Sequence, residues 1–241
     1  MAILILQHVE GDHPGLLGEM LQSYHLPYQV VKVDAEPLPD RLDYEALIVL
    51  GGPQSAADNQ TPSILQEKAL IGEALARDIP YLGLCLGGQL LAAVCGAEIS
   101  QGTVTEIGFY EVQLTEEGLR DPLFCAFPDR SHQVFHWHHD TFELPAGAVL
   151  LERGATVASQ SFRYGARAYG FQYHMELTAA MVPNWLDVHP EREQALRLLG
   201  EGYQRIRDGL PTRYPLYARH TALLFDNFLT ICGLRTQDEH K

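Results

Sequence analysis

One cysteine of the chain stands where a reactive thiol would be expected, between an apolar run and a helix-forming run. Cys85 follows residues 81–84 and precedes a stretch of leucine and alanine, and Gly83 and Gly87 flank it two residues away on either side. In a strand, sharp turn and helix, such glycines remove Cβ atoms that would otherwise collide. The N-terminus of the helix also favours a thiolate over a thiol. Cys85 is therefore the candidate nucleophile.

The flanking glycines distinguish Cys85 from the other cysteines of the chain. With 21 glycines in 241 residues, four cysteines would produce a Gly-x-Cys-x-Gly pattern by chance in about 3% of such sequences. The competing interpretation is a buried cysteine in a glycine-rich turn. Cys95, Cys125 and Cys232 lie far apart without a CxxC spacing, and we expect them in the core.

A cysteine nucleophile needs a base, and the base needs a group that orients it. His174 and Glu176 could supply both, because the strand period of two would place them on one side of a strand ending near residue 173. The same His-x-acid spacing occurs at residues 8–10 and 138–140. Its position at the end of a predicted sheet strand favours the His174 pair.

The reaction also needs donors for a developing oxyanion. The N–H of Leu86 follows the nucleophile directly, and a glycine N–H in the loop after the third predicted strand is the natural second donor. Gly52, within Gly51-Gly52-Pro53, is the candidate. A plain turn is an equally good interpretation of this tripeptide.

Alternating strands and helices must position these groups. Over residues 2–95 the pattern predicts a parallel, doubly wound α/β sheet, whose ligands bind beyond the carboxyl ends of the strands. Further strands and then helices follow, without a linker that would divide the chain, so we expect one domain over 1–241. The expected strands are 2–6, 28–33, 44–50, 81–84, 109–114, 133–138, 148–153, 156–162 and 168–173; the expected helices are 15–24, 61–77, one from residue 86, 177–187, 190–208 and 215–232.

Composition excludes several classes of function. The net charge of −14, without a basic run, argues against nucleic acid or an anionic membrane surface as partner. No apolar stretch approaches the roughly 18 residues that span a bilayer, and residues 1–6 do not resemble a signal peptide. We expect a cytoplasmic protein that acts on a small molecule.

Taken together, these motifs resemble the class I glutamine amidotransferase family. Its members carry a Gly-x-Cys-x-Gly-x-Gln elbow, a Gly-Pro oxyanion loop and a late His-x-Glu, in the order found here. The resemblance covers about residues 2–187, and it implies a flavodoxin-like, mostly parallel sheet flanked by helices, with C-terminal helices over about 190–232. Glu106-Ile107-Gly108 and residues 137–142 look most like stand-alone relatives of the GMP synthase glutaminase domain.

The resemblance also implies a role for each matching residue. Cys85 would attack the side-chain amide carbon of glutamine, His174 would pass the proton to departing ammonia, and Glu176 would orient His174. Water would then hydrolyse the thioester, without a cofactor. The residues implied in substrate binding are Gln54, Ser55, Gln89, His138 and Asp140.

Two positions depart from the family pattern. Met175 stands between the histidine and the glutamate, where proline is common, and Gly88 stands where a larger residue is common. Neither change removes a reacting group. A smaller residue near the nucleophile could admit a substrate larger than glutamine.

A histidine-rich stretch invites a metal-site interpretation, since imidazole suits zinc. We favour a site without metal, because two of these residues match a family loop that is not metallic. The cluster consists of His132, His136, His138, His139 and Asp140.

Four functions fit these observations. The first is hydrolysis of the glutamine amide with release of ammonia, which in the family normally serves a synthetase. Since the chain has neither a GxxxxGK[ST] nor an SGGxDS nucleotide loop, that synthetase would be a separate subunit. The second is a stand-alone γ-glutamyl peptidase. A non-catalytic regulatory protein and a cysteine peptidase or glyoxalase-like enzyme on a related elbow fold are the others.

Overall fold

The computed structural model describes residues 2–102, 104–188, 192–193, 197 and 202–236. Its centre is a mixed sheet of nine strands in the order β2-β1-β3-β4-β11-β10-β9-β6-β7. The first five strands in this order run parallel, and the remaining four continue the sheet in antiparallel pairs. The strands are β1 (Ile3–Gln7), β2 (Tyr28–Lys32), β3 (Ala46–Val49), β4 (Tyr81–Leu84), β6 (Glu106–Leu114), β7 (Ser131–His138), β9 (Val149–Gly154), β10 (Ser161–Tyr164) and β11 (Ala168–Phe171), with a separate pair β5 (Ile99–Ser100) and β8 (Thr141–Phe142).

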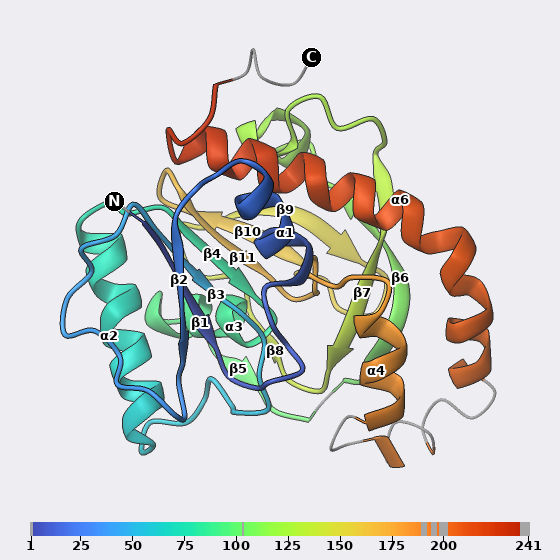
Figure 1. Ribbon diagram of the computed structural model, residues 1–241, viewed down its shortest axis with the longest axis horizontal. Helices are drawn as coiled ribbons and strands as arrows, with labels where there is room; N and C mark the ends of the chain where they lie inside the picture. The colour runs from blue at the N-terminus through green and yellow to red at the C-terminus, as the bar shows by residue number, and fades with distance from the viewer. Residues whose placement is uncertain (1, 103, 189–191, 194–196, 198–201, 237–241) are drawn as a thin grey trace.

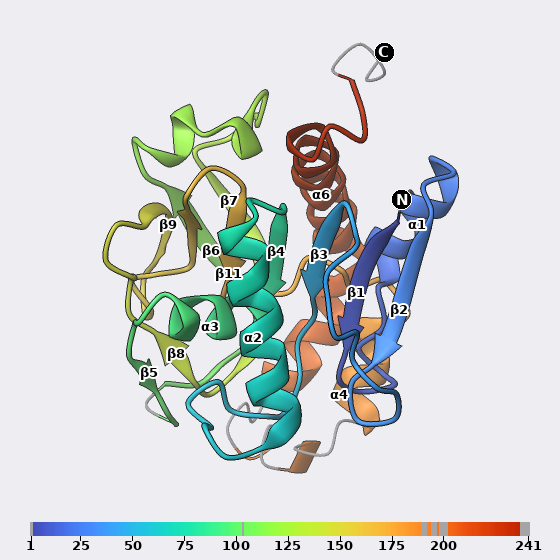
Figure 2. The same ribbon diagram turned by 90° about the vertical axis from the view of Figure 1, so that its left-hand side faces the viewer.

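Helices cover both faces of the parallel half of the sheet (Figures 1 and 2). Side chains of β1 alternate between two apolar clusters: Ile3 and Ile5 face α1 and α6, whereas Leu4 and Leu6 face α2 and α3. This burial on both faces explains the unbroken apolar runs of the central strands. The helices are α1 (Gly15–Ser23), α2 (Pro62–Ala76), α3 (Leu86–Val94), α4 (Met181–Val188) and α6 (Gly202–Ile231), with short 3₁₀ helices at Gly118–Arg120 and Pro122–Phe124.

Several predicted elements have other bounds in the structure; β6, for example, begins at Glu106 and α4 at Met181. The expected strand over 156–162 corresponds to β10, which is shorter and begins only at Ser161. The chain first makes a turn after β9, in which the Gly154 N–H donates to Val157 O. The expected strand over 168–173 ends at Phe171. Parts of the expected helix over 190–208 lie outside the described residues.

The last helix begins earlier than predicted, at residue 202 instead of 215. Pro211 and Pro215 lie inside it, and both are exposed. Each proline removes one helical N–H, but the residues four positions earlier, Arg207 and Pro211, are exposed, so water can bond their carbonyl groups and the helix continues. Within the described residues, no helix combines the length and apolar character that crossing a bilayer would require.

Candidate active site

Cys85 occupies a strained turn between β4 and α3. Its φ is +50° and its ψ is −103°, a conformation that non-glycine residues rarely adopt. The turn is held because the Cys85 N–H donates to Phe171 O at 2.9 Å. A Cβ on Gly83 would lie 2.4 Å from the backbone of Gly87, and a Cβ on Gly87 would lie 2.2 Å from Val49 O. Both glycines are therefore required by close backbone packing.

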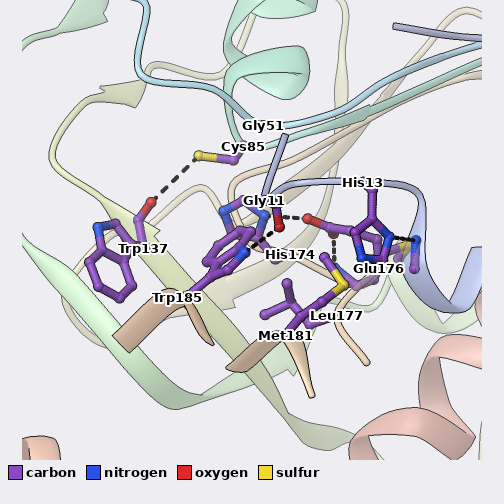
Figure 3. A network of polar contacts seen from close by, with 12 residues as sticks. Gly11, His13, Gly51, Cys85, Trp137, His174, Glu176, Leu177, Met181 and Trp185 are labelled. Atoms are coloured by element: carbon purple, nitrogen blue, oxygen red, sulfur yellow. Dashed lines mark hydrogen bonds and ion pairs between the residues drawn. The ribbon is translucent and has the colours of Figure 1, made fainter. Parts of the chain in front are cut away.

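A cavity of about 360 Å³ opens over the cysteine at the carboxyl ends of the parallel strands. The Cys85 side chain is 5% exposed and lines this cavity, and its Sγ lies 3.8 Å from Trp137 O (Figure 3). The other lining residues are Val9, Gly11, Asp12, Gly52, Pro53, Gln54, Gln89, Trp137, His138, His139, Asp140, His174, Asn184, Trp185 and Val188.

His174 lies in the same cavity, beyond the end of β11. Its backbone N–H donates to Phe135 O at 2.9 Å. Its ring packs edge-on against Trp185, with 4.7 Å between the ring centroids. Nδ1 of His174 lies 2.6 Å from Oε1 of Glu176. Figure 3 shows the two side chains next to each other. The predicted contact is present, but the strand period does not explain it, because residues 175 and 176 are not in a strand.

The protonation states of His174 and Glu176 depend on each other and on their neighbours. Burial alone would lower the pKa of His174, but the Glu176 carboxylate and the Cys85 sulfur raise it well above its ordinary value. Burial alone would raise the pKa of Glu176, but His174 and a hydrogen bond from Asp12 hold it below its ordinary value. The arrangement favours an imidazolium between a carboxylate and a sulfur.

Of the two candidate oxyanion donors, one directly follows Cys85 in the chain and the other belongs to a residue that lines the cavity. Leu86 is the first residue of α3, where backbone N–H groups have no partner within the helix. Gly52 lines the cavity, and no hydrogen bond among the described residues uses its N–H.

Four of the five predicted substrate-binding residues line the cavity, and Ser55 does not. Ser55 donates instead to Oδ2 of Asp140, a lining residue, at 2.8 Å. Gln89 donates to Asp140 O at 3.0 Å. Both ring nitrogens of His138 are engaged, by Asp140 O and by Glu106, each at 3.0 Å. His138 thus fixes the loop that carries Asp140.

Residues 16–182 match the family model described as glutamine amidotransferase class-I. The chain belongs to the class I glutamine amidotransferase family.

Individual members of this family resemble the chain over most of its length. A glutamine amidotransferase-like protein of Salmonella typhimurium is 36% identical over 165 residues, which are 66% of this chain and 68% of that protein. One of the subunits of the glutamine-hydrolysing GMP synthase of Archaeoglobus fulgidus is 27% identical over 69% of this chain and 85% of its own length. The crystal structure of a glutamine amidotransferase from Thermotoga maritima has a TM-score of 0.83 at 29% identity, covering 96% of this chain and 98% of that one. The predicted flavodoxin-like fold is confirmed.

The two departures from the family pattern have structural consequences. The Met175 N–H donates to Oε2 of Glu176 at 2.8 Å, a bond that proline could not make. Gly88 does not widen the cavity, contrary to the expectation from its size. A Cβ there would lie 2.3 Å from Phe171 O, so Gly88 allows α3 to approach β11.

Asp12 is a residue of the candidate site that sequence reasoning missed. It lines the cavity, is 3% exposed, and has a carboxylate oxygen within 4.8 Å of atoms of His174 and Glu176. Burial and the neighbouring Glu176 charge raise the pKa of Asp12 well above its ordinary value. Two buried carboxyl groups in contact share a proton, so Asp12 is the neutral partner.

The histidine-rich stretch does not form one cluster, and His139 pairs with the Thr105 hydroxyl at 2.9 Å, away from the buried groups. Glu106, His136 and His138 are buried and could each offer one metal ligand. Glu106 Oε2, however, is already paired with His138 Nε2 at 3.0 Å and with Gln160 Nε2 at 3.1 Å. These bonds explain the buried carboxylate without a cation. His132 lies apart from them, with its Nε2 2.5 Å from Glu152.

The remaining cysteines are less buried than predicted. Cys125 is exposed in the turn after a 3₁₀ helix, and Cys95 and Cys232 are partly buried. Apolar character alone does not decide burial for a residue in a surface turn.

Proposed function

We propose that the chain hydrolyses the side-chain amide of glutamine or of a γ-glutamyl compound through a thioester on Cys85. The observation that supports this most directly is the shared cavity of Cys85 and His174, with His174 held by Glu176 at 2.6 Å. Nucleophile, base and orienter then stand in the order that covalent acyl transfer requires.

The proposed first half-reaction forms the thioester. The Cys85 thiolate attacks the amide carbon, and the N–H groups of Gly52 and Leu86 stabilise the oxyanion. When the C–N bond breaks, Nε2 of His174 gives its proton to the nitrogen, which leaves as ammonia or as an amine.

The second half-reaction releases the acid. His174 removes a proton from a water molecule, whose oxygen attacks the thioester carbon. The C–S bond breaks, and the products are glutamate, the Cys85 thiolate and a protonated His174. Glu176 stabilises that imidazolium in both steps, as the orienting carboxylate does in other triads.

The cavity favours the γ-glutamyl peptidase as a second candidate. Its volume of about 360 Å³ lies within the ~300–1,000 Å³ typical of sites for drug-sized ligands, a class of molecule larger than a single amino acid. Trp137, Trp185 and Val188 give part of it an apolar wall. An amine larger than ammonia could leave along that wall.

A glutaminase that serves a separate synthetase subunit is the other candidate. The Archaeoglobus relative is named as a subunit of GMP synthase, and 85% of it is covered by this chain. A comparison of substrates distinguishes the peptidase from the glutaminase of a synthetase. The purified protein is incubated separately with glutamine, glutathione and γ-glutamyl dipeptides in the presence of EDTA. The release of glutamate is then measured for each substrate. Faster cleavage of peptides supports the peptidase. Slow hydrolysis of glutamine alone supports a missing synthetase, and no hydrolysis of any substrate would contradict the proposed function.

A further inference from the structure

A buried histidine–glutamate pair contacts the Gly51-Gly52-Pro53 loop on the side away from the cavity. Nε2 of His8, at the end of β1, lies 2.9 Å from Oε2 of Glu67 on α2, and both side chains are fully buried. Neither residue lines the cavity, so neither can touch the substrate there. The other ring nitrogen of His8, Nδ1, lies 2.9 Å from Gly51 O.

The partners of His8 determine where its proton lies. A carbonyl oxygen only accepts hydrogen bonds, so Nδ1 must carry the proton that it shares with Gly51 O. At Nε2, either an N–H donates to the Glu67 carboxylate, or a protonated Glu67 donates to a bare nitrogen. In both cases Nδ1 keeps its proton, and Glu67 prevents the ring from turning.

This bond fixes the direction of the next N–H group. Gly51 C=O and Gly52 N–H belong to one planar trans peptide, so they point in opposite directions. With the carbonyl held toward His8, the Gly52 N–H points away from His8. Gly52 itself lines the cavity that Cys85 and His174 share.

Two consecutive glycines would otherwise leave this peptide free to rotate, because glycine has the greatest backbone freedom of any residue. The fit is close: a Cβ on Gly52 would lie 2.7 Å from Cβ of His8. His8 therefore both packs against the peptide and holds it by a hydrogen bond.

We propose that His8 is a positioning residue of the oxyanion hole, which holds the Gly52 N–H toward the reacting carbonyl oxygen by donating from Nδ1 to Gly51 O. Glu67 holds the His8 ring in that orientation. The proposal rests on the proposed function for its catalytic consequence, and on the structure alone for the orientation of the peptide.

A matched pair of variants tests the catalytic consequence. His8→Asn and His8→Leu both lose the contact with Glu67, but the asparagine amide can still donate to Gly51 O and leucine cannot. The measurements are kcat and KM, and inhibition by glutamate and by glutamate γ-semialdehyde. The aldehyde adds to Cys85 and places its oxygen in the oxyanion hole, whereas glutamate forms no tetrahedral adduct.

We expect His8→Leu to lower kcat by up to the ~10²–10³-fold seen when an oxyanion-hole donor is lost, with KM hardly changed. Inhibition by the aldehyde should weaken by a similar factor, and inhibition by glutamate should stay the same. His8→Asn should keep most of the activity. Equal kcat values in the two variants, or equal weakening of both inhibitors, would overturn the proposal.

The wild-type protein provides a test that needs neither activity nor a variant. In a sample with ¹⁵N-labelled histidine, NMR should show a proton attached to Nδ1 of His8. A bare Nδ1 would overturn the positioning role. Absence of turnover in the wild type would count against the proposed function only, because this measurement would still decide the state of His8.

Discussion

Nδ1 of His174 lies 2.6 Å from Oε1 of Glu176, and both side chains are buried. The carboxylate contributes to the raised pKa of His174, so the imidazolium should persist above the ordinary histidine value of 6.5. We expect the alkaline limb of kcat/KM to lie above that pH, because loss of the proton removes the acid that protonates the leaving group. Glu176→Gln should move this limb to lower pH, as a pH–rate profile would show. An unmoved limb would contradict the coupling.

His174 itself should matter more than its orienting partner. We expect His174→Ala to lower turnover by about 10²–10⁴-fold, the range typical of general acid–base groups. Glu176→Gln should cost less, because the imidazole can still reach the sulfur. Steady-state rates of both variants check the order. Wild-type activity in His174→Ala would place the base elsewhere.

Cys85 should be the most reactive thiol although it is not the most exposed. At neutral pH iodoacetamide should modify Cys85 faster than the exposed Cys125, because Cys85 opens into the cavity at a helix N-terminus and shares that cavity with the base His174. Burial raises the pKa of Cys95 to about 11, so that thiol should react slowly. Peptide mapping over time measures all three. Faster modification of Cys125 than of Cys85 would refute the assignment.

Asp12 should make the protein less stable as the pH rises. Its folded pKa is raised above the ordinary 3.8, so above that pH the folded state keeps a proton that the unfolded state has lost. The free energy of unfolding therefore falls as the pH rises from 3.8 toward the folded pKa. Asp12→Asn retains a donor for Glu176 but binds no proton in either state.

Urea unfolding at several pH values compares the two proteins. The stability of Asp12→Asn relative to the wild type should increase with pH. Parallel curves would mean that Asp12 does not hold the extra proton.

The close approach at Gly88 predicts a loss of stability on substitution. Gly88→Ala should lower the free energy of unfolding by about 1–3 kcal/mol or more, since the added methyl group would meet the Phe171 backbone. Gly72 in α2 is the control: a Cβ there meets nothing within 4 Å. Gly72→Ala should add about 0.5–1 kcal/mol. Similar effects of the two substitutions in urea unfolding would contradict the packing at Gly88.

Sequence patterns correctly predicted those features of the site that are formed by residues adjacent in the chain. The elbow at Cys85 follows from a strand, a turn and a helix that are adjacent in the chain, and apolar runs identified the buried parallel strands. The contact between His174 and Glu176 was predicted from a strand that ends before them. The backbone of His174 is held instead by a bridge to Phe135 of β7, which is distant in the sequence.

Asp12 and His8 could not be identified in this way. Both follow β1, and they reach the site only because β1 pairs with β3 in the sheet. Nothing in the residues near Asp12 indicates a glutamate far along the chain as its partner. The burial that changes its pKa is likewise a property of the folded protein.

Covalent labelling by a glutamine analogue tests the central claim most directly. The purified protein is incubated with 6-diazo-5-oxo-L-norleucine, and its intact mass and modified peptide are determined, with Cys85→Ala as the control. If the Cys85 sulfur attacks a γ-glutamyl carbonyl, one adduct should form on Cys85 and glutamine should slow its formation. An unmodified wild-type protein, or an adduct that also forms on Cys85→Ala, would contradict the proposed thioester mechanism.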